Sequence, residues 1–201
     1  MQRYHPGTAL VVVDVQNDFA DPAGGLSVAG GDAIVPTVDR EVAMAGANGA
    51  VVVFTQDWHP ATTPHFAKDG GIWPVHCVRD TWGAKLHPDL RTPDDAPLVR
   101  KGVNGEDGYS GFTMRDPITG ETVPTELETL LRGRGIERVV VVGLATDYCV
   151  RTTVLDAARL GFETSVLTDA IAAVDVEPGD GDRAIDEMRQ AGVSVLRTVM
   201  P

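Results

Sequence analysis

Cys149 lies just beyond an apolar run, where a polar, helix-forming stretch begins. If Thr146 or Asp147 caps that helix, the sulfur lies in the first turn, where the helix dipole and free amides favour a negative charge. A thiol in such a position can have its pKa lowered from about 8.5 to between about 3.5 and 7.5. Cys149 is therefore a candidate nucleophile. The alternative is a buried, inert cysteine at the junction of a strand and a helix.

Asp14 and Lys101 also stand at the ends of apolar runs. A carboxylate that ends a wholly apolar strand must be desolvated or paired, and either outcome perturbs its pKa. Taken singly, Asp14 could be a structural hydrogen-bond acceptor and Lys101 a solvated surface charge. Together with Cys149, and at adjacent strand ends, they would supply a nucleophile, a general base and a cation that stabilises charge.

A second group of chemical side chains begins at Asp57. Asp57 and His59 are two residues apart, so in an extended segment both side chains point to one face. His65 and His76 follow, which places three of the five histidines within 18 residues. These nitrogen and oxygen ligands suit Zn, Mn or Fe rather than a Cys-rich structural zinc site. The alternative is a loop whose histidines only satisfy turns and cap strands.

Four aromatic residues lie beside these polar groups in the sequence: Phe19, Trp73, Tyr109 and Tyr148. Aromatic walls can clamp a flat substrate, although each ring taken singly also suits a hydrophobic core.

Three Val-rich runs lack polar alternation, which is typical of strands buried on both faces of a parallel sheet. These runs are 9–15, 50–56 and 138–144, and weaker candidate strands are 97–102, 163–170 and 193–199. Helix-length segments lie between them at 32–48, 124–134, 147–160 and 181–191. The alternation predicts a doubly wound α/β fold, in which ligands bind beyond the carboxyl ends of the strands.

A length of 201 residues with 43% hydrophobic content predicts one domain spanning 1–201. The stretch from about 57 to 123 breaks the alternation and is rich in Pro, Gly, Trp and His. Because long irregular inserts in compact domains are usually functional, we expect this one to bind metal and substrate.

Composition excludes several classes of partner. A net charge of -12 without clustered Lys or Arg argues against nucleic acid. The apolar run 9–13 is broken by Asp14, which argues against a signal segment or a membrane span. Two cysteines with 71 intervening residues form no disulfide framework, so we expect a cytoplasmic protein. No Gly-rich nucleotide-binding motif follows a strand.

Seven motifs together resemble the nicotinamidases of the isochorismatase-like cysteine hydrolase family. They occur in the family's order over nearly the whole chain: VVVDVQNDF, DWHP, PHF, WPVHC, RKG, YSGF and GLATDYCV. The resemblance implies a six-stranded parallel sheet with helices on both faces and a catalytic triad of Asp14, Lys101 and Cys149. It also implies a metal held by Asp57, His59 and His76, with His65 as a candidate fourth ligand.

The same resemblance implies a cis peptide bond between Leu144 and Ala145, and an oxyanion hole formed by the backbone amides of Ala145 and Cys149. The implied reaction converts nicotinamide to nicotinate and ammonia through a thioester, with Zn as the expected metal and Mn or Fe as alternatives. Tyr148 departs from several relatives, which carry histidine there, and the segment 101–109 is one residue longer than in some of them.

Two other functions fit parts of the pattern. A related amidase would act on another small amide or carbamoyl compound, but metal-free branches of the family lack the histidine set. A non-catalytic metal- or ligand-binding domain would leave the combination of Asp14, Lys101 and Cys149 without a purpose. The expected partner is a small-molecule substrate, and a homo-oligomer is compatible with the sequence.

Overall fold

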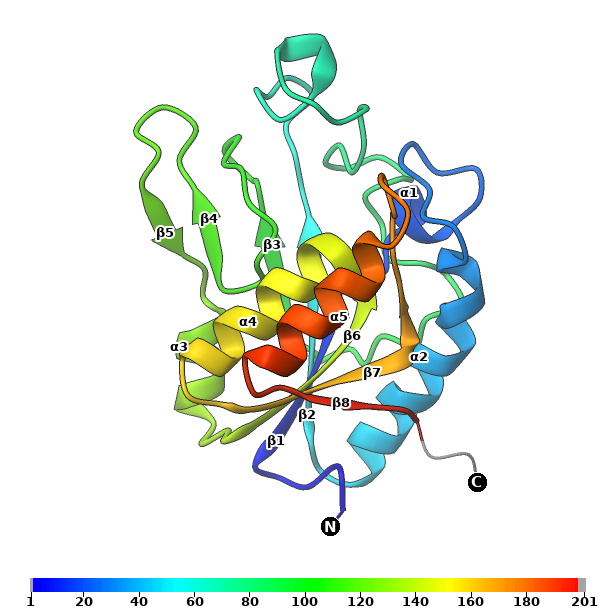
Figure 1. Cartoon of the computed structure of the whole chain (residues 1–201), viewed down its shortest axis with the longest axis vertical. Helices are drawn as coiled ribbons and strands as arrows, with labels where there is room; N and C mark the ends of the chain where they lie inside the picture. Colours follow the sequence, from blue (N-terminus) through cyan, green and yellow to red (C-terminus); the bar gives the residue numbers. More distant parts are fainter. Residues whose placement is uncertain (1, 199–201) are drawn as a thin grey trace.

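Six parallel strands form the central sheet in a computed structural model of the chain, which describes residues 2–198 (Figure 1). The strand order is β3-β2-β1-β6-β7-β8, and every neighbouring pair is parallel. The predicted six-stranded parallel α/β fold is thereby confirmed. The strands are β1 (Thr8–Val13), β2 (Val51–Asp57), β3 (Leu98–Lys101), β6 (Arg138–Leu144), β7 (Glu163–Ala172) and β8 (Ser194–Leu196).

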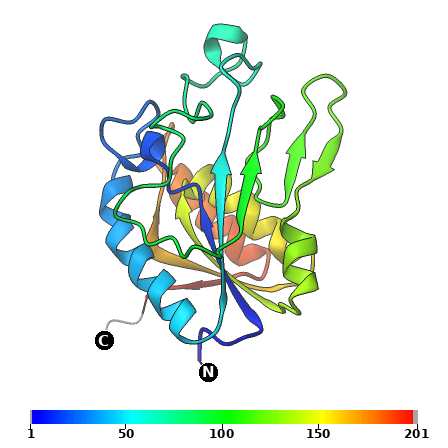
Figure 2. The same ribbon diagram turned by 180° about the vertical axis from the view of Figure 1, so that it is seen from behind.

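Burial on both faces explains the uninterrupted Val runs. All six residues of β1 are buried, and alternate side chains of this strand enter two different cores. Leu10 and Val12 pack with α2, whereas Val11 packs with residues of α3, α4 and α5. Figures 1 and 2 show α2 on one face of the sheet and α4 and α5 on the opposite face. The helices are α2 (Gly31–Ala47), α3 (Leu127–Gly133), α4 (Arg151–Arg159) and α5 (Asp180–Gln190).

The carboxyl edge of the sheet carries structure that the periodicity did not predict. A short helix α1 (Asn17–Ala20) follows β1, and a 3₁₀ turn covers Ala67–Asp69. The hairpin of β4 (Thr113–Arg115) and β5 (Thr122–Pro124) is antiparallel and projects from the same edge as the 57–97 loops (Figure 2). Each hairpin strand has three residues, which is too short for a readable pattern.

Most predicted boundaries shift by one or two residues, and three elements change more. β5 occupies the start of the helix expected at 124–134, and the helix expected at 147–160 begins with the π-helical turn Thr146–Val150. The strand expected at 193–199 ends at Leu196, and residue 199 lies outside the described residues. No helix of the described chain is long and apolar enough to cross a membrane.

The strand order reverses between β1 and β6, which are neighbours although 124 residues separate Val13 from Arg138. This is the switch point at which open α/β sheets bind ligands. Gly143 permits the close approach of the two strands there. Its φ is 114°, and a Cβ at this position would lie 2.1 Å from the carbonyl oxygen of Val13. Asp14 and the turn that carries Cys149 are thus side by side.

Candidate active site

Asp14, Lys101 and Cys149 meet in a buried cluster at the switch point. Lys101 Nζ lies 2.8 Å from Asp14 Oδ2 and 3.6 Å from Cys149 Sγ. All three residues are buried, with Asp14 fully inaccessible. The expectation of three adjacent strand ends is wrong in one respect, because β2 lies between β1 and β3. The long lysine side chain reaches the other two residues across the end of β2.

Asp57 ends β2 and contacts two groups at once. Its Oδ1 atom lies 2.8 Å from Lys101 Nζ, while Oδ2 lies 3.7 Å from His59 Nε2 and 3.9 Å from His76 Nε2. Burial by itself would raise the pKa of Asp57, but Lys101 and the imidazoles hold that pKa well below its usual range. Burial would likewise lower the pKa of Lys101, but the carboxylates of Asp14 and Asp57 raise it well above its usual value. Asp57 and Lys101 are therefore both ionised at neutral pH.

Asp14 has the properties of a group that exchanges protons. Burial raises the pKa of its carboxyl group, and the opposing attraction of Lys101 does not cancel that rise. Thr55, on the adjacent strand β2, donates a hydrogen bond of 2.6 Å to Asp14 Oδ1. Thr55 is fully buried and was not predicted as a site residue. A carboxylate with a raised pKa can take a proton from a neighbour and later return it.

The predicted acidic thiol is wrong for Cys149. Burial raises the pKa of this thiol well above its usual value; Lys101 opposes the rise, and Asp14 and Asp57 add to it. The predicted side-chain cap is also absent, since Ala145 occupies the cap position and no side chain caps the turn. Asp147 instead accepts hydrogen bonds from the backbone N–H groups of Val174 and Asp175. The resting thiol keeps its proton, so attack requires a base.

The turn that carries Cys149 begins at the Leu144–Ala145 peptide bond, which is cis, as the resemblance implies. The carbonyl oxygen of Ala145 accepts hydrogen bonds from Tyr148 N–H and Val150 N–H, at 3.1 and 3.0 Å. The N–H of Cys149, between these two, does not bond to that oxygen. π-helical turns of this kind are frequent at functional sites.

His59, His65 and His76 form a buried cluster beside Asp57. Their ligating nitrogen atoms lie within 4.8 Å of one another. His76 Nδ1 lies 2.7 Å from the carbonyl oxygen of Pro74, and this bond leaves Nε2 as an acceptor. Burial lowers the pKa of His76 to about 4, so its ring is neutral at physiological pH.

The histidine cluster fits a divalent cation. Both ring nitrogens of His59 are buried without a hydrogen-bond partner in the described part of the chain. Buried polar atoms are rarely left unpaired, and three imidazoles with one carboxylate form a typical Zn, Mn or Fe ligand set. The ring of His59 also packs against Gly102, where a Cβ would lie 2.5 Å from His59 Nδ1. The structure thus places the predicted fourth ligand, His65, with the other ligand candidates.

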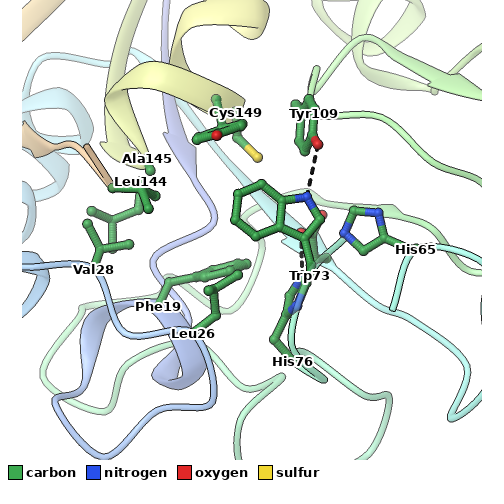
Figure 3. A pocket seen from close by; sticks show the side chains of 13 residues that line it. Phe19, Leu26, Val28, His65, Trp73, His76, Tyr109, Leu144, Ala145 and Cys149 are labelled. Atoms are coloured by element: carbon green, nitrogen blue, oxygen red, sulfur yellow. Dashed lines mark hydrogen bonds and ion pairs between the residues drawn. The ribbon is translucent and has the colours of Figure 1, made fainter. Parts of the chain in front are cut away.

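A pocket lined by Cys149, His65 and His76 lies between the thiol and the histidines. Trp73 Nε1 donates a hydrogen bond of 2.9 Å to the hydroxyl of Tyr109, and its ring meets that of Tyr148 edge-on. Figure 3 shows the indole of Trp73 projecting into the pocket. The four predicted aromatic residues, Phe19, Trp73, Tyr109 and Tyr148, all line this pocket, together with the unpredicted residues Leu26, Val28, Leu144 and Val174.

Two polar residues near the site also escaped prediction. Gln16 bonds the backbone of Asp57 in both directions, since its amide donates to Asp57 O and accepts from Asp57 N–H. Asp107 lies 2.7 Å from His65 Nδ1. Gln16 follows a predicted strand directly and could have been found from that position. Asp107 lies in the irregular insert, where the sequence offers no comparable signal.

The doubly wound sheet, the thiol, carboxylate and ammonium at its switch point and the adjoining histidines define an α/β protein of the cysteine-hydrolase class. The chain belongs to the isochorismatase family, whose Isochorismatase domain model matches residues 8–199. A nicotinamidase of Escherichia coli strain K12 is 38% identical over 206 residues, covering 94% of each chain.

Two solved structures are similar over nearly the whole chain. The pyrazinamidase of Pyrococcus horikoshii in complex with zinc is 40% identical, with a TM-score of 0.86 and coverage of 96% of this chain and 100% of that one. PnC1 of L. infantum in complex with nicotinate is 36% identical, with a TM-score of 0.86 and coverage of 98% and 96%.

Proposed function

We propose that this protein is a metal-dependent cysteine amidohydrolase that converts nicotinamide to nicotinate and ammonia, a reaction of NAD salvage. The observation that carries the proposal is the position of Lys101, whose ammonium contacts Asp14, Asp57 and Cys149 together. This contact supports the proposal because it brings the Cys149 thiol and the Asp14 carboxylate close to Asp57 and the histidine cluster. The relatives named for nicotinamide or pyrazinamide hydrolysis, and the nicotinate complex, support the same substrate class.

The first half of the reaction forms a bond from Cys149 Sγ to the carboxamide carbon. Asp14 takes the thiol proton, which the raised thiol pKa makes necessary. The ammonium of Lys101 stabilises the negative charge that moves from the Asp14 carboxylate to the sulfur. The carbonyl electron pair moves to oxygen, and the backbone N–H groups of Ala145 and Cys149 receive this oxyanion. Each such donor is worth about 3 to 4 kcal/mol in acyl transfer.

The second half breaks the carbon–nitrogen bond. Protonated Asp14 delivers its proton to the departing amide nitrogen, so that ammonia leaves and a thioester remains on Cys149. Asp14 then takes a proton from water, whose oxygen attacks the thioester carbon. The carbon–sulfur bond then breaks, and the Asp14 proton returns to the sulfur. The product leaves as nicotinic acid, which loses its proton to solvent to give nicotinate, so each group regains its starting state.

The cation would be held by Asp57, His59, His65 and His76. Zn²⁺ is the expected metal, and Mn²⁺ or Fe²⁺ are alternatives. When bound, it would orient the substrate through the ring nitrogen of nicotinamide. The flat ring would be held from the sides by the four aromatic residues that line the pocket, Phe19, Trp73, Tyr109 and Tyr148.

We further propose that residues 1–201 form one domain with a metal- and substrate-binding insert at 57–123. A net charge of -12 without clustered Lys or Arg disfavours nucleic acid as a partner. The two cysteines and the broken apolar run at 9–13 favour action in the cytoplasm without a membrane span.

Ammonia release from nicotinamide tests the function. Zinc-loaded protein should release ammonia, Cys149→Ala should lose more than about 1,000-fold in rate, and chelation should abolish turnover. Cys77→Ala, which removes the other buried cysteine, should stay active. If zinc- and manganese-loaded protein releases no ammonia from nicotinamide, the proposed substrate is wrong. Activity that survives Cys149→Ala would exclude the covalent mechanism.

The same assay distinguishes a nicotinamidase from a related amidase that acts on another small amide or carbamoyl compound. A small aliphatic amide or a carbamoyl compound that is hydrolysed faster than nicotinamide would place the protein among the other amidases of the family. Faster hydrolysis of nicotinamide would support the proposed function, because the histidine cluster suits a substrate with a metal-binding ring nitrogen.

A further inference from the structure

Within the described part of the chain, the Nδ1 atom of the His65 ring has one hydrogen-bond partner, the carboxylate of Asp107. The atoms Nδ1 of His65 and Oδ1 of Asp107 are 2.7 Å apart, and the His65 side chain is 5% exposed while that of Asp107 is 46% exposed. A carboxylate only accepts hydrogen bonds, so Nδ1 carries the proton and Nε2 presents its lone pair. The two residues are 42 positions apart in the sequence.

Asp107 is hydrogen-bonded to the end of strand β4. Its backbone N–H donates to the carbonyl oxygen of Arg115 at 2.8 Å, and the N–H of Arg115 donates back to Asp107 O at 2.5 Å. Gly108 N–H donates to the same Oδ1 atom that His65 contacts. The carboxylate is thus fixed to strand β4, outside the parallel sheet. This fixation gives His65 a partner whose position depends on the β4–β5 hairpin.

His65 separates two hollows. It lines the substrate pocket with His76, and it lines a second, outer pocket with Asp107, Arg115 and Asp116. Asp107 lines the outer pocket and is not among the residues that line the substrate pocket. His76 needs no such partner because the carbonyl of Pro74, two residues away, already fixes its ring.

We propose that Asp107 is a positioning residue that holds His65 in the tautomer and orientation needed to bind the cation. The proposal rests on the metal site of the proposed function. Partners of this kind orient ligating histidines and raise their basicity, and their loss typically weakens metal binding about 10- to 100-fold. The β4–β5 hairpin thereby contributes to metal affinity, although none of its residues is a ligand candidate.

Competition between metal-loaded protein and a chromogenic chelator, for Zn²⁺ and for Mn²⁺, measures this role without substrate. Asp107→Ala should weaken binding about 10- to 100-fold. Asp107→Asn should lose less, because its amide oxygen can still accept from Nδ1. The ¹⁵N chemical shifts of His65 should show one tautomer in the wild type and a mixture in Asp107→Ala, which a merely structural contact would not produce.

Asp116→Asn is the matched control. It removes one negative charge from the same outer pocket, but the Asp116 carboxylate accepts from the N–H groups of Ile118 and Thr119 and contacts no histidine. Its metal affinity should stay within about threefold of the wild type, as expected for a half-buried surface charge that contacts no ligand candidate. Asp107→Asn keeps the side-chain shape, so it preserves the test if Asp107→Ala folds poorly.

Several outcomes would overturn the inference. Asp107 variants that bind zinc as tightly as the wild type, or an Asp116→Asn protein that loses as much affinity as Asp107→Ala, would exclude a positioning role. Wild-type protein that binds neither cation would overturn both this inference and the metal site. Asp107-dependent metal binding without ammonia release from nicotinamide would support the inference and count against the proposed function alone.

Discussion

Lys101 and Asp57 form a buried ion pair of 2.8 Å that joins the thiol cluster to the histidine cluster. The carboxylate uses one oxygen for the ammonium and points the other toward His59 and His76. Lys101 also pairs with Asp14, so a single buried ammonium compensates two buried carboxylates. A change of charge at the candidate metal site would therefore act through Asp57 and Lys101 on the candidate nucleophile, and the reverse also holds.

Lys101→Met should destabilise the fold strongly. It leaves the carboxylates of Asp14 and Asp57 buried without their cation, and breaking a buried pair in this way costs about 3 to 5 kcal/mol. The free energy of unfolding from urea titration measures the effect. Lys68→Met is the control, because that side chain is 44% exposed and its ion pair with Asp69 is worth less than about 1 kcal/mol. Equal losses in the two variants would contradict the prediction.

Thr55→Val should lower kcat for nicotinamide about tenfold, with little change in KM. The variant keeps the side-chain shape but removes the hydroxyl that bonds Asp14 Oδ1, and a hydrogen bond to a charged group contributes about 1.5 to 3 kcal/mol. Steady-state ammonia release gives both constants. Thr164→Val, whose hydroxyl bonds the Phe162 carbonyl, serves as the control. A rise in KM at constant kcat would show that Thr55 acts on substrate binding instead.

His59→Ala should reduce zinc affinity by at least about 100-fold, because it removes a ligand rather than a partner of a ligand. The His59 ring is buried and stacks on His65, so the metal-free variant should also lose thermal stability, and its zinc affinity is compared under conditions where it is folded. Chelator competition and metal analysis of purified protein measure the affinity. His87→Ala should bind zinc normally, since His87 is not in the cluster. Unchanged zinc content in His59→Ala would exclude this ligand.

Gly143→Ala should destabilise the protein by at least about 2 kcal/mol. The added methyl group would lie 2.1 Å from the Val13 carbonyl oxygen, and φ at this position is 114°. Urea unfolding gives the difference from wild type. In Gly133→Ala the new methyl group meets no atom within 4 Å, so that variant should be neutral or more stable by up to about 1 kcal/mol. A stable, active Gly143→Ala protein would show that β1 and β6 can separate there.

The local hydrophobic pattern predicted the strands of the parallel sheet well, but it did not predict the β4–β5 hairpin or the loop residues that line the pocket. The run 138–144 coincides with β6 because burial on both faces imposes apolar residues at every position. The β4–β5 hairpin gave no such signal, since its strands have three residues and each packs little of its length into the core. Val174 lines the pocket from a loop, where a single valine cannot be told from a core residue by its neighbours in sequence.

By itself, the sequence determined which chemical groups lie at the carboxyl ends of the strands. A strand buried on both faces is a run of consecutive apolar residues, so the first polar residue after the run marks the end of the strand. Only the tertiary structure decided how those groups share charge. It showed that Lys101 crosses the end of β2, that Asp57 faces two clusters, and that burial raises the thiol pKa of Cys149 where a helix terminus alone predicted a decrease. Desolvation and Coulomb interactions depend on distances through space, and these are set by strand order rather than by spacing along the chain.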